Sequence, residues 1–220
     1  MSRIAPGKLS KIPIVLTFIS CCLTIGCSAN NQPVIASVVQ QGTVVLVTHD
    51  DAREPTGATA VAAGEGVYRW ARRGPWRLYV QPSSELGGWS SRHLELVDEA
   101  VRAWTACKGV DITLVSLPRD ADIRLYWTDR LPSTNPGVTM LYRNVSGGLA
   151  RADVFVDVRP APWHTGTPDR VLYATIAHEM GHALGLPHDP SPAALMHPSP
   201  LVTRVTVADR ARLETLLSGR

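Results

Sequence analysis

The fold of this chain is decided by one stretch, residues 178–188, which reads HEMGHALGLPH. Residues four apart lie on the same face of a helix, so the side chains of His178 and His182 can point at one metal ion. Gly185 can adopt the positive φ that ends a helix, and the chain can then turn back so that His188 supplies a third nitrogen. Three protein ligands leave the fourth position open, which is typical of a catalytic zinc site.

Glu179 follows the first of these histidines and lies one position round the helix. It is near enough to the metal to act there and is offset enough to reach a metal-bound water, so we expect it to be the general base. A histidine pair at helical spacing is often only a surface or core pair. The added glycine and third histidine favour a metal site over that interpretation. Nitrogen ligands in a tetrahedral arrangement suit zinc, although manganese, iron or cobalt could occupy the same ligands.

A second motif follows, because residues 194–198 read ALMHP. The two motifs together resemble the zinc-binding helix and the Met-turn of the metzincin metallopeptidases, most closely the matrixin-like branch. The resemblance implies one catalytic zinc ion, Glu179 as the base, Met196 in the hydrophobic floor beneath the ligands, and hydrolysis of peptide bonds in proteins or peptides through a zinc-activated water. His197 and Pro200 stand where tyrosines are common in matrixins, so no substrate preference is carried over.

A second class of function, other than an endopeptidase, is also compatible with the sequence. The chain could be an envelope lipoprotein that retains the metzincin shell as a zinc-binding or structural module without proteolysis. Glu179 argues against this alternative, because a binding module needs no base beside its metal. Hydrolysis of a non-protein amide, such as an envelope peptide, would use the same residues and stays open.

Hydrophobic periodicity outside the motifs predicts five strands and three helices. The strands are expected at 77–81, 110–117, 121–127, 138–142 and 149–158, and the helices at 91–107, from 168 through the histidine motif, and at 206–217. This order resembles the matrixin-like domain over about residues 67–218. It implies an α+β, metzincin (zincin-like) fold, with a twisted, mostly parallel sheet of about five strands, a long backing helix, an active-site helix and a C-terminal helix.

The first 26 residues are typical of an export signal. Basic residues precede a mostly apolar run of 14 positions, residues 12–25, which is shorter than the roughly 20 residues that span a bilayer. Residues 23–27 read LTIGC and resemble the lipobox of bacterial lipoproteins. We therefore expect residues 1–26 to be a lipoprotein-type signal peptide and Cys27 to be lipidated. The protein would then be anchored in the membrane of a bacterial cell envelope, in the periplasm or on the outer surface. The alternatives are cleavage near Ala29 with secretion, or a leader that stays uncleaved as an anchor.

Residues 27–66 match no compact domain, although a short strand could form at 44–47. From residue 54 onward they are rich in Gly, Ala, Thr and Pro, which is typical of a linker. They are interpreted as a tether or as a short pro-segment that inhibits the site, with the polar residues 49–51 as candidate caps on the zinc. Residues 67–220 are expected to form the metallopeptidase domain.

The charge balance bears on binding partners, and the cysteine count bears on disulfides. The chain has 22 Lys and Arg against 19 Asp and Glu, but three of the basic residues lie in the first 26 positions, which leaves 19 of each sign. Nucleic-acid binding needs a basic surplus, so we expect no nucleic-acid partner. The resemblance implies a protein or peptide substrate, and we expect a monomer. Cys107 has no partner once the leader and its cysteines are set aside, and we expect a half-buried thiol. A structural calcium ion, seen in relatives, could bind scattered acidic residues, namely Asp120, Asp122, Asp153 and Asp157.

Overall fold

The computed structural model describes residues 35–40, 43–48, 59–131, 136–159 and 166–219, all of which belong to the unit Pro33–Arg220. The predicted signal peptide, Cys27 and the candidate zinc caps at 49–51 lie outside the described residues. No helix in the described part of the chain combines the length and apolarity needed to cross a bilayer.

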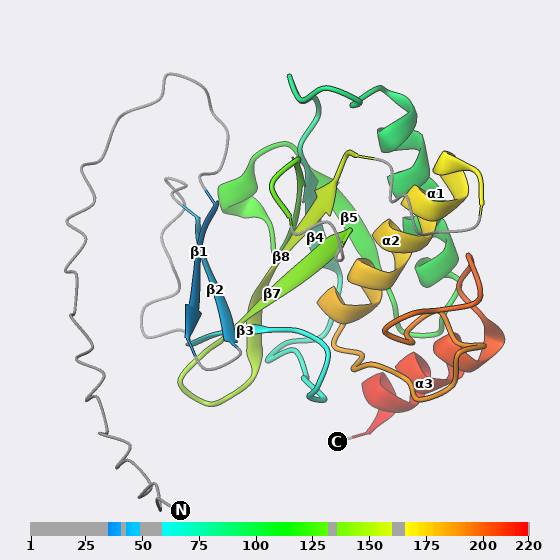
Figure 1. The fold of residues 1–220 in the computed structure, drawn as a ribbon. Helices are drawn as coiled ribbons and strands as arrows, with labels where there is room; N and C mark the ends of the chain where they lie inside the picture. The colour runs from blue at the N-terminus through cyan, green and yellow to red at the C-terminus, as the bar shows by residue number, and fades with distance from the viewer. Residues whose placement is uncertain (1–34, 41–42, 49–58, 132–135, 160–165, 220) are drawn as a thin grey trace, which may run out of the picture. The chain divides into compact units, whose positions relative to one another are not determined.

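The centre of this unit is a mixed sheet of six strands in the order β3-β7-β8-β6-β4-β5 (Figure 1). Strands β4, β5, β6 and β8 pair in parallel, β7 is antiparallel to β8, and β3 is antiparallel to β7. The bounds are β3 (Thr59–Ala62), β4 (Trp76–Val80), β5 (Ile112–Val115), β6 (Ile123–Thr128), β7 (Gly137–Arg143) and β8 (Leu149–Asp157). The expected α+β fold and its five strands are confirmed, and β3 adds a sixth that was not predicted.

Strand β3 lies within the segment that sequence analysis assigned to a tether or pro-segment. It reads TAVA, and its small side chains give little hydrophobic signal. It is held by backbone pairing along β7, from Thr59 opposite Arg143 to Ala62 opposite Met140, and the Ala63 N–H continues the pairing onto the Thr139 carbonyl at 2.9 Å. This part of residues 27–66 therefore belongs to the sheet. Further upstream, β1 (Ile35–Gln40) and β2 (Thr43–Thr48) form a two-stranded antiparallel sheet, and β2 contains the short strand expected at 44–47.

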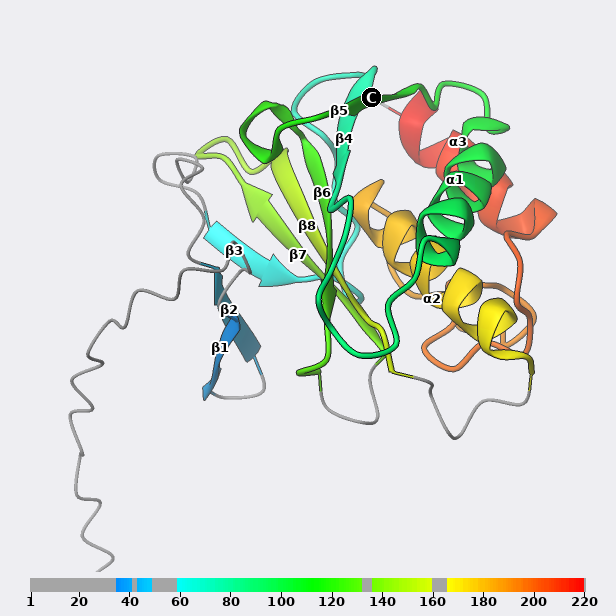
Figure 2. The same cartoon turned by 90° about the horizontal axis from the view of Figure 1, so that it is seen from above.

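The helices are α1 (Arg92–Thr105), α2 (Pro168–Ala183) and α3 (Val207–Ser218). Figure 2 shows α1 and α2 side by side on one face of the sheet. Helix α1 buries Leu96, Val97 and Trp104, which recur at helical spacing. The Trp104 indole N–H donates to the Ala177 carbonyl at 2.9 Å, so α1 is bonded to the middle of α2. The backing helix thus fixes the helix that carries the histidine motif.

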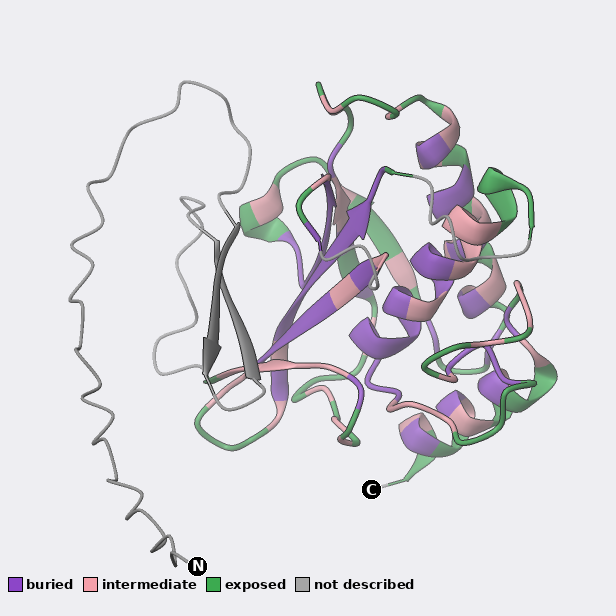
Figure 3. Ribbon diagram, in the orientation of Figure 1, coloured by how far each residue is buried: buried purple, intermediate pink, exposed green. Residues whose placement is uncertain are grey.

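The central strands are buried on both faces, as the purple strands in Figure 3 show. Every residue of β6 is buried, and in β8 only Ala150 is partly exposed. One face packs against the helices, and the other forms a smaller aromatic cluster around Tyr126, Tyr142 and Phe155. These strands are nevertheless not continuous apolar runs, because the face away from the helices also carries the buried charged residues Arg124, Arg151 and Asp153.

Candidate metal centre

Helix α2 and the turn that follows it bring the three predicted ligands together. The ring centroids of His178 and His182 are 4.7 Å apart, as expected for residues one helical turn apart. The helix ends just before Gly185, which has φ +105, and a Cβ there would lie 2.2 Å from the Tyr68 carbonyl oxygen. Only glycine permits this reversal, which carries His188 back so that the ligand nitrogens of the three histidines lie within 4.8 Å of one another.

Two of the histidines are oriented by backbone carbonyls. The Nδ1 of His178 lies 2.7 Å from the Leu195 carbonyl oxygen, and the Nδ1 of His182 lies 2.7 Å from the Leu186 carbonyl oxygen. A carbonyl can only accept, so Nδ1 carries the proton in both rings and Nε2 keeps a free lone pair. This is the tautomer that a metal ion requires, and the residues present therefore fit a zinc ion.

Burial keeps the three ligands neutral. It lowers the pKa of His178 to about 4 and the pKa of His182 well below its ordinary value, and it also lowers the pKa of His188. The backbone hydrogen bonds oppose this effect in His178 and His182 without overcoming it. Neutral imidazoles need release no proton before they bind a cation at neutral pH.

Glu179 is buried between α2 and β7. The Thr139 hydroxyl donates to Glu179 Oε2 at 2.7 Å, and a Cβ on Gly137 would lie 2.6 Å from Glu179 Cγ. Gly137 and Thr139 are two positions apart on β7, so they lie on the same face of the strand, and that face is directed at the helix. Burial raises the pKa of Glu179 to about 7 in the metal-free protein, although the bond from Thr139 partly offsets that rise. The carboxyl group is therefore balanced between taking up and releasing a proton near neutral pH.

Met196 lies under α2 at the level of the histidine pair. It is fully buried, and a Cβ on Gly181 would lie 2.4 Å from Met196 Sδ. Gly181 is the residue before His182, so the sulfur packs against the helix where it carries the ligands. The position agrees with the floor that the resemblance implies for Met196.

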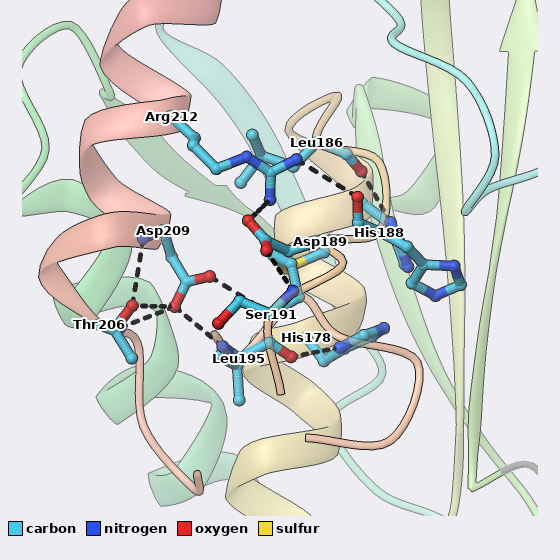
Figure 4. A network of polar contacts seen from close by, with 11 residues as sticks. His178, Leu186, His188, Asp189, Ser191, Leu195, Thr206, Asp209 and Arg212 are labelled. Carbon is cyan, nitrogen blue, oxygen red and sulfur yellow. Dashed lines mark hydrogen bonds and ion pairs between the residues drawn. The ribbon is translucent and has the colours of Figure 1, made fainter. Parts of the chain in front are cut away.

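A buried aspartate of α3 holds the turn that contains Met196. Asp209 accepts hydrogen bonds from the backbone N–H groups of Leu195 at 3.0 Å, Met196 at 3.3 Å and Thr206 at 2.8 Å (Figure 4). The Leu195 carbonyl, which shares a peptide group with the Met196 N–H, accepts the hydrogen bond from His178. Asp209 therefore helps to orient the ligand His178 through one intervening residue, Leu195. This role was not predicted from the sequence, although Thr206 and Asp209 have the spacing of a helix capping box, which the structure forms.

The remaining candidates do not belong to the cluster of three ligands, although His197 is near enough to His178 and His188 to interact with them electrostatically. Within the residues that the structure describes, these histidines are the one group of three or more potential metal ligands. The His197 Nδ1 accepts from the Ser199 N–H at 3.0 Å. Cys107 is buried, which raises the pKa of its thiol to about 11 and makes it a poor nucleophile.

Of the candidate calcium ligands, three carboxylates are paired with arginines, namely Asp122, Asp153 and Asp157.

Comparison with known proteins agrees with this geometry. Residues 90–213, more than half of the chain, match the family model of the matrixins. The chain belongs to the matrixin family. Matrixins use a catalytic zinc ion, and the three histidines of this matrixin form a cluster able to hold one.

Individual matrixin relatives are also similar to this chain. The chain is 31% identical to matrix metalloproteinase-20 of Homo sapiens over 108 residues, 47% of this chain and 22% of that protein. It is 34% identical to stromelysin-3 of Rattus norvegicus over 131 residues, 57% of this chain and 24% of that protein. Interstitial collagenase of Sus scrofa is 30% identical over 112 residues, 49% of this chain and 24% of that protein. The matches thus span about a quarter of the length of each relative.

Proposed function

We propose that this matrixin is a zinc-dependent endopeptidase that hydrolyses peptide bonds in proteins or peptides. The observation that carries the proposal is the placement of a buried Glu179 on the same helix as two neutral, oriented histidines, with His188 completing the set. A structural metal site needs four protein ligands and no base, whereas this site offers three nitrogens and, beside them, a buried carboxyl group.

Each residue of the site has a distinct role in the proposed reaction. A zinc ion bound by the three histidines would polarise the scissile carbonyl and lower the pKa of a bound water toward roughly 7. Glu179 takes the proton of the attacking water on a carboxylate oxygen and returns it to the departing amine. Thr139 keeps the carboxyl group fixed during both transfers, because its hydroxyl donates to Oε2 at 2.7 Å, the shorter of its two contacts with Glu179. No covalent intermediate with the protein is needed.

The test separates metal binding from catalysis. We expect Glu179→Ala and wild type to carry the same amount of zinc, because Glu179 is not a ligand, and only the wild type to cleave a mixed peptide library. Glu85→Ala is the control, since Glu85 is exposed and lies outside the site. Cleavage by the zinc-loaded Glu179→Ala protein at the wild-type rate would exclude the role given to this residue. If wild type binds zinc and cleaves no peptide or amide, the alternative of a zinc-binding module is favoured instead.

We further propose export and attachment to a bacterial envelope membrane through a lipid on Cys27. The support is the sequence alone, namely the basic start, the short apolar run and the LTIGC motif at residues 23–27. Mass spectrometry of the mature N-terminus after expression in a bacterial host tests this. We expect a modified Cys27 at the N-terminus and a soluble, unmodified protein from Cys27→Ser. An unmodified N-terminus near Ala29 in the wild type would show secretion without an anchor.

A further inference from the structure

The third ligand lies outside the helix that orients the other two. His188 follows the turn at Gly185 and is only partly buried. A loop residue has no helical hydrogen bonds to fix its backbone, so other parts of the chain must do so if the imidazole is to hold one position. In this structure, both backbone polar groups of His188 form hydrogen bonds to other parts of the chain. Its N–H donates to the Gly64 carbonyl at 2.7 Å, and its carbonyl accepts from Arg212 at 3.3 Å.

Gly64 contacts the ligand ring itself. A Cβ on Gly64 would lie 2.8 Å from His188 Cε1 and 3.0 Å from His188 Nδ1, and its φ is +130. The bare backbone of this glycine therefore packs against the edge of the imidazole. The sheet sets the position of Gly64. The N–H of the preceding residue, Ala63, donates to the Thr139 carbonyl at the end of the pairing between β3 and β7. The sheet thus positions one side of the third ligand.

Arg212 holds the other side from α3. It lies one turn beyond Asp209, and its guanidinium forms an ion pair with Asp189, the residue after the ligand, at 2.6 Å (Figure 4). The same guanidinium reaches the His188 carbonyl. Both charged side chains are largely shielded, with 31% and 12% of their surfaces exposed for Arg212 and Asp189, so solvent weakens the pair less than it would at the surface. The Asp189 N–H in turn donates to the Met196 carbonyl at 2.8 Å.

We propose that Gly64 and Arg212 are positioning residues for the third metal ligand, and that the metal centre therefore extends into the segment before residue 67. Gly64 lies outside the matrixin match at 90–213 and outside the domain predicted at 67–220. The inference rests on the proposed zinc site. It adds that His178 and His182 are oriented at Nδ1 by the Leu195 and Leu186 carbonyls, whereas His188 is held through its own backbone, by Gly64 next to β3 and by Arg212 of α3.

Zinc affinity of the full chain tests this without recourse to activity. Competition with a chromophoric chelator gives the zinc dissociation constant for wild type, Gly64→Ala and Arg212→Ala. We expect both variants to bind zinc about 10- to 100-fold more weakly, the range typical of residues that orient ligands. Arg212→Lys should recover part of the loss, because lysine keeps the charge opposite Asp189. The absorption spectrum of the cobalt-substituted proteins should also change, since it reports the geometry of the ligands.

Matched controls separate positioning from general damage. Gly147 also has positive φ, +84, with open space around its Cβ, so Gly147→Ala tests backbone strain alone. Arg210→Ala removes a neighbouring charge from the same helix. We expect both controls to bind zinc like wild type. If Gly64→Ala fails to fold, Arg212→Ala and Arg212→Lys decide.

The outcomes distinguish this inference from the proposed function. A wild type that does not bind zinc contradicts the proposed function itself. A wild type that binds zinc tightly, with both variants within about twofold of it and unchanged cobalt spectra, overturns the positioning roles and leaves the zinc site intact. An equal loss in the two control variants overturns the roles as well.

Discussion

Thr139 donates its hydroxyl proton to Glu179 Oε2 at 2.7 Å, so a residue of β7 fixes the carboxyl group proposed as the base. The two residues are 40 positions apart in the chain, and both are buried. The sheet therefore takes part in the site as directly as the helix that carries the motif. The proposed reaction would therefore depend on a hydroxyl group that the histidine motif does not include.

Thr139→Val removes this hydroxyl at nearly constant volume. We expect kcat/KM for a peptide substrate to fall about tenfold, because a buried hydrogen bond to a charged group stabilises by roughly 1.5–3 kcal/mol. Zinc content should be unchanged. Thr139→Ser keeps the hydroxyl and should retain most of the activity. Equal rates for the valine variant and wild type would show that Glu179 needs no support from β7.

Gly181→Ala tests the packing of the Met-turn beneath the histidine pair. Alanine normally stabilises a helix by about 1 kcal/mol relative to glycine. Here its Cβ would lie 2.4 Å from Met196 Sδ and 2.9 Å from Trp104 Cζ2, so we expect a net destabilisation of about 1–3 kcal/mol in urea unfolding. Combining it with Met196→Ala should remove most of the extra cost of Gly181→Ala. Strict additivity of the two changes would contradict the contact.

Asp209→Asn tests the link between α3 and the Met-turn. The carboxylate accepts from three backbone N–H groups, whereas an amide brings its own N–H group toward some of them. Since Asp209 is fully buried, we expect a loss of about 2–3 kcal/mol in unfolding free energy. Asp98→Asn is the control, because Asp98 is an exposed residue paired with Arg102. A loss no greater than that of the control would exclude the role of Asp209.

Asp122 provides a pH-dependent contribution to stability. Burial alone would raise the pKa of its carboxyl group, but hydrogen bonds from Arg77 and the charges of Arg72 and Arg77 hold the pKa below its ordinary value of 3.8. A carboxylate whose pKa is lower in the folded state stabilises the protein fully above pH 3.8, and this stabilisation is lost as the pH falls through the lowered pKa.

Urea unfolding of wild type and Asp122→Asn at several pH values checks the sign. We expect the asparagine variant to be clearly less stable at pH 7, with the difference shrinking steadily below pH 4. A difference that stays constant between pH 7 and pH 3 would show that the carboxylate charge contributes nothing.

The ligand helix could be predicted because its spacing is local. Helical periodicity alone places His178 and His182 on one face, and Gly185 marks the reversal that delivers His188. The order of strands and helices followed from hydrophobic patterns in the same way. Apolar residues recur at alternate positions of β6, namely Ile123, Leu125 and Trp127, so the sheet that supports the site was largely predictable.

The supports of the site could not be predicted, because they join segments distant in sequence. The pattern of β3 is weak, since its pairing uses backbone groups and small side chains. Gly64 resembles any linker glycine until His188 is seen beside it. Arg212 and Asp209 sit on α3 as ordinary charged residues, and only the fold shows that one faces the third ligand and the other the Met-turn.

Removal and return of zinc tests the central claim most directly. The full chain is freed of metal with a chelator and incubated with a mixed peptide library, and zinc is then added stepwise. We predict that cleavage disappears without metal and returns in full at about one zinc ion per chain, the stoichiometry of a single three-histidine site. Peptide cleavage that persists in the metal-free protein, or a zinc-loaded protein that cleaves nothing, would contradict the account.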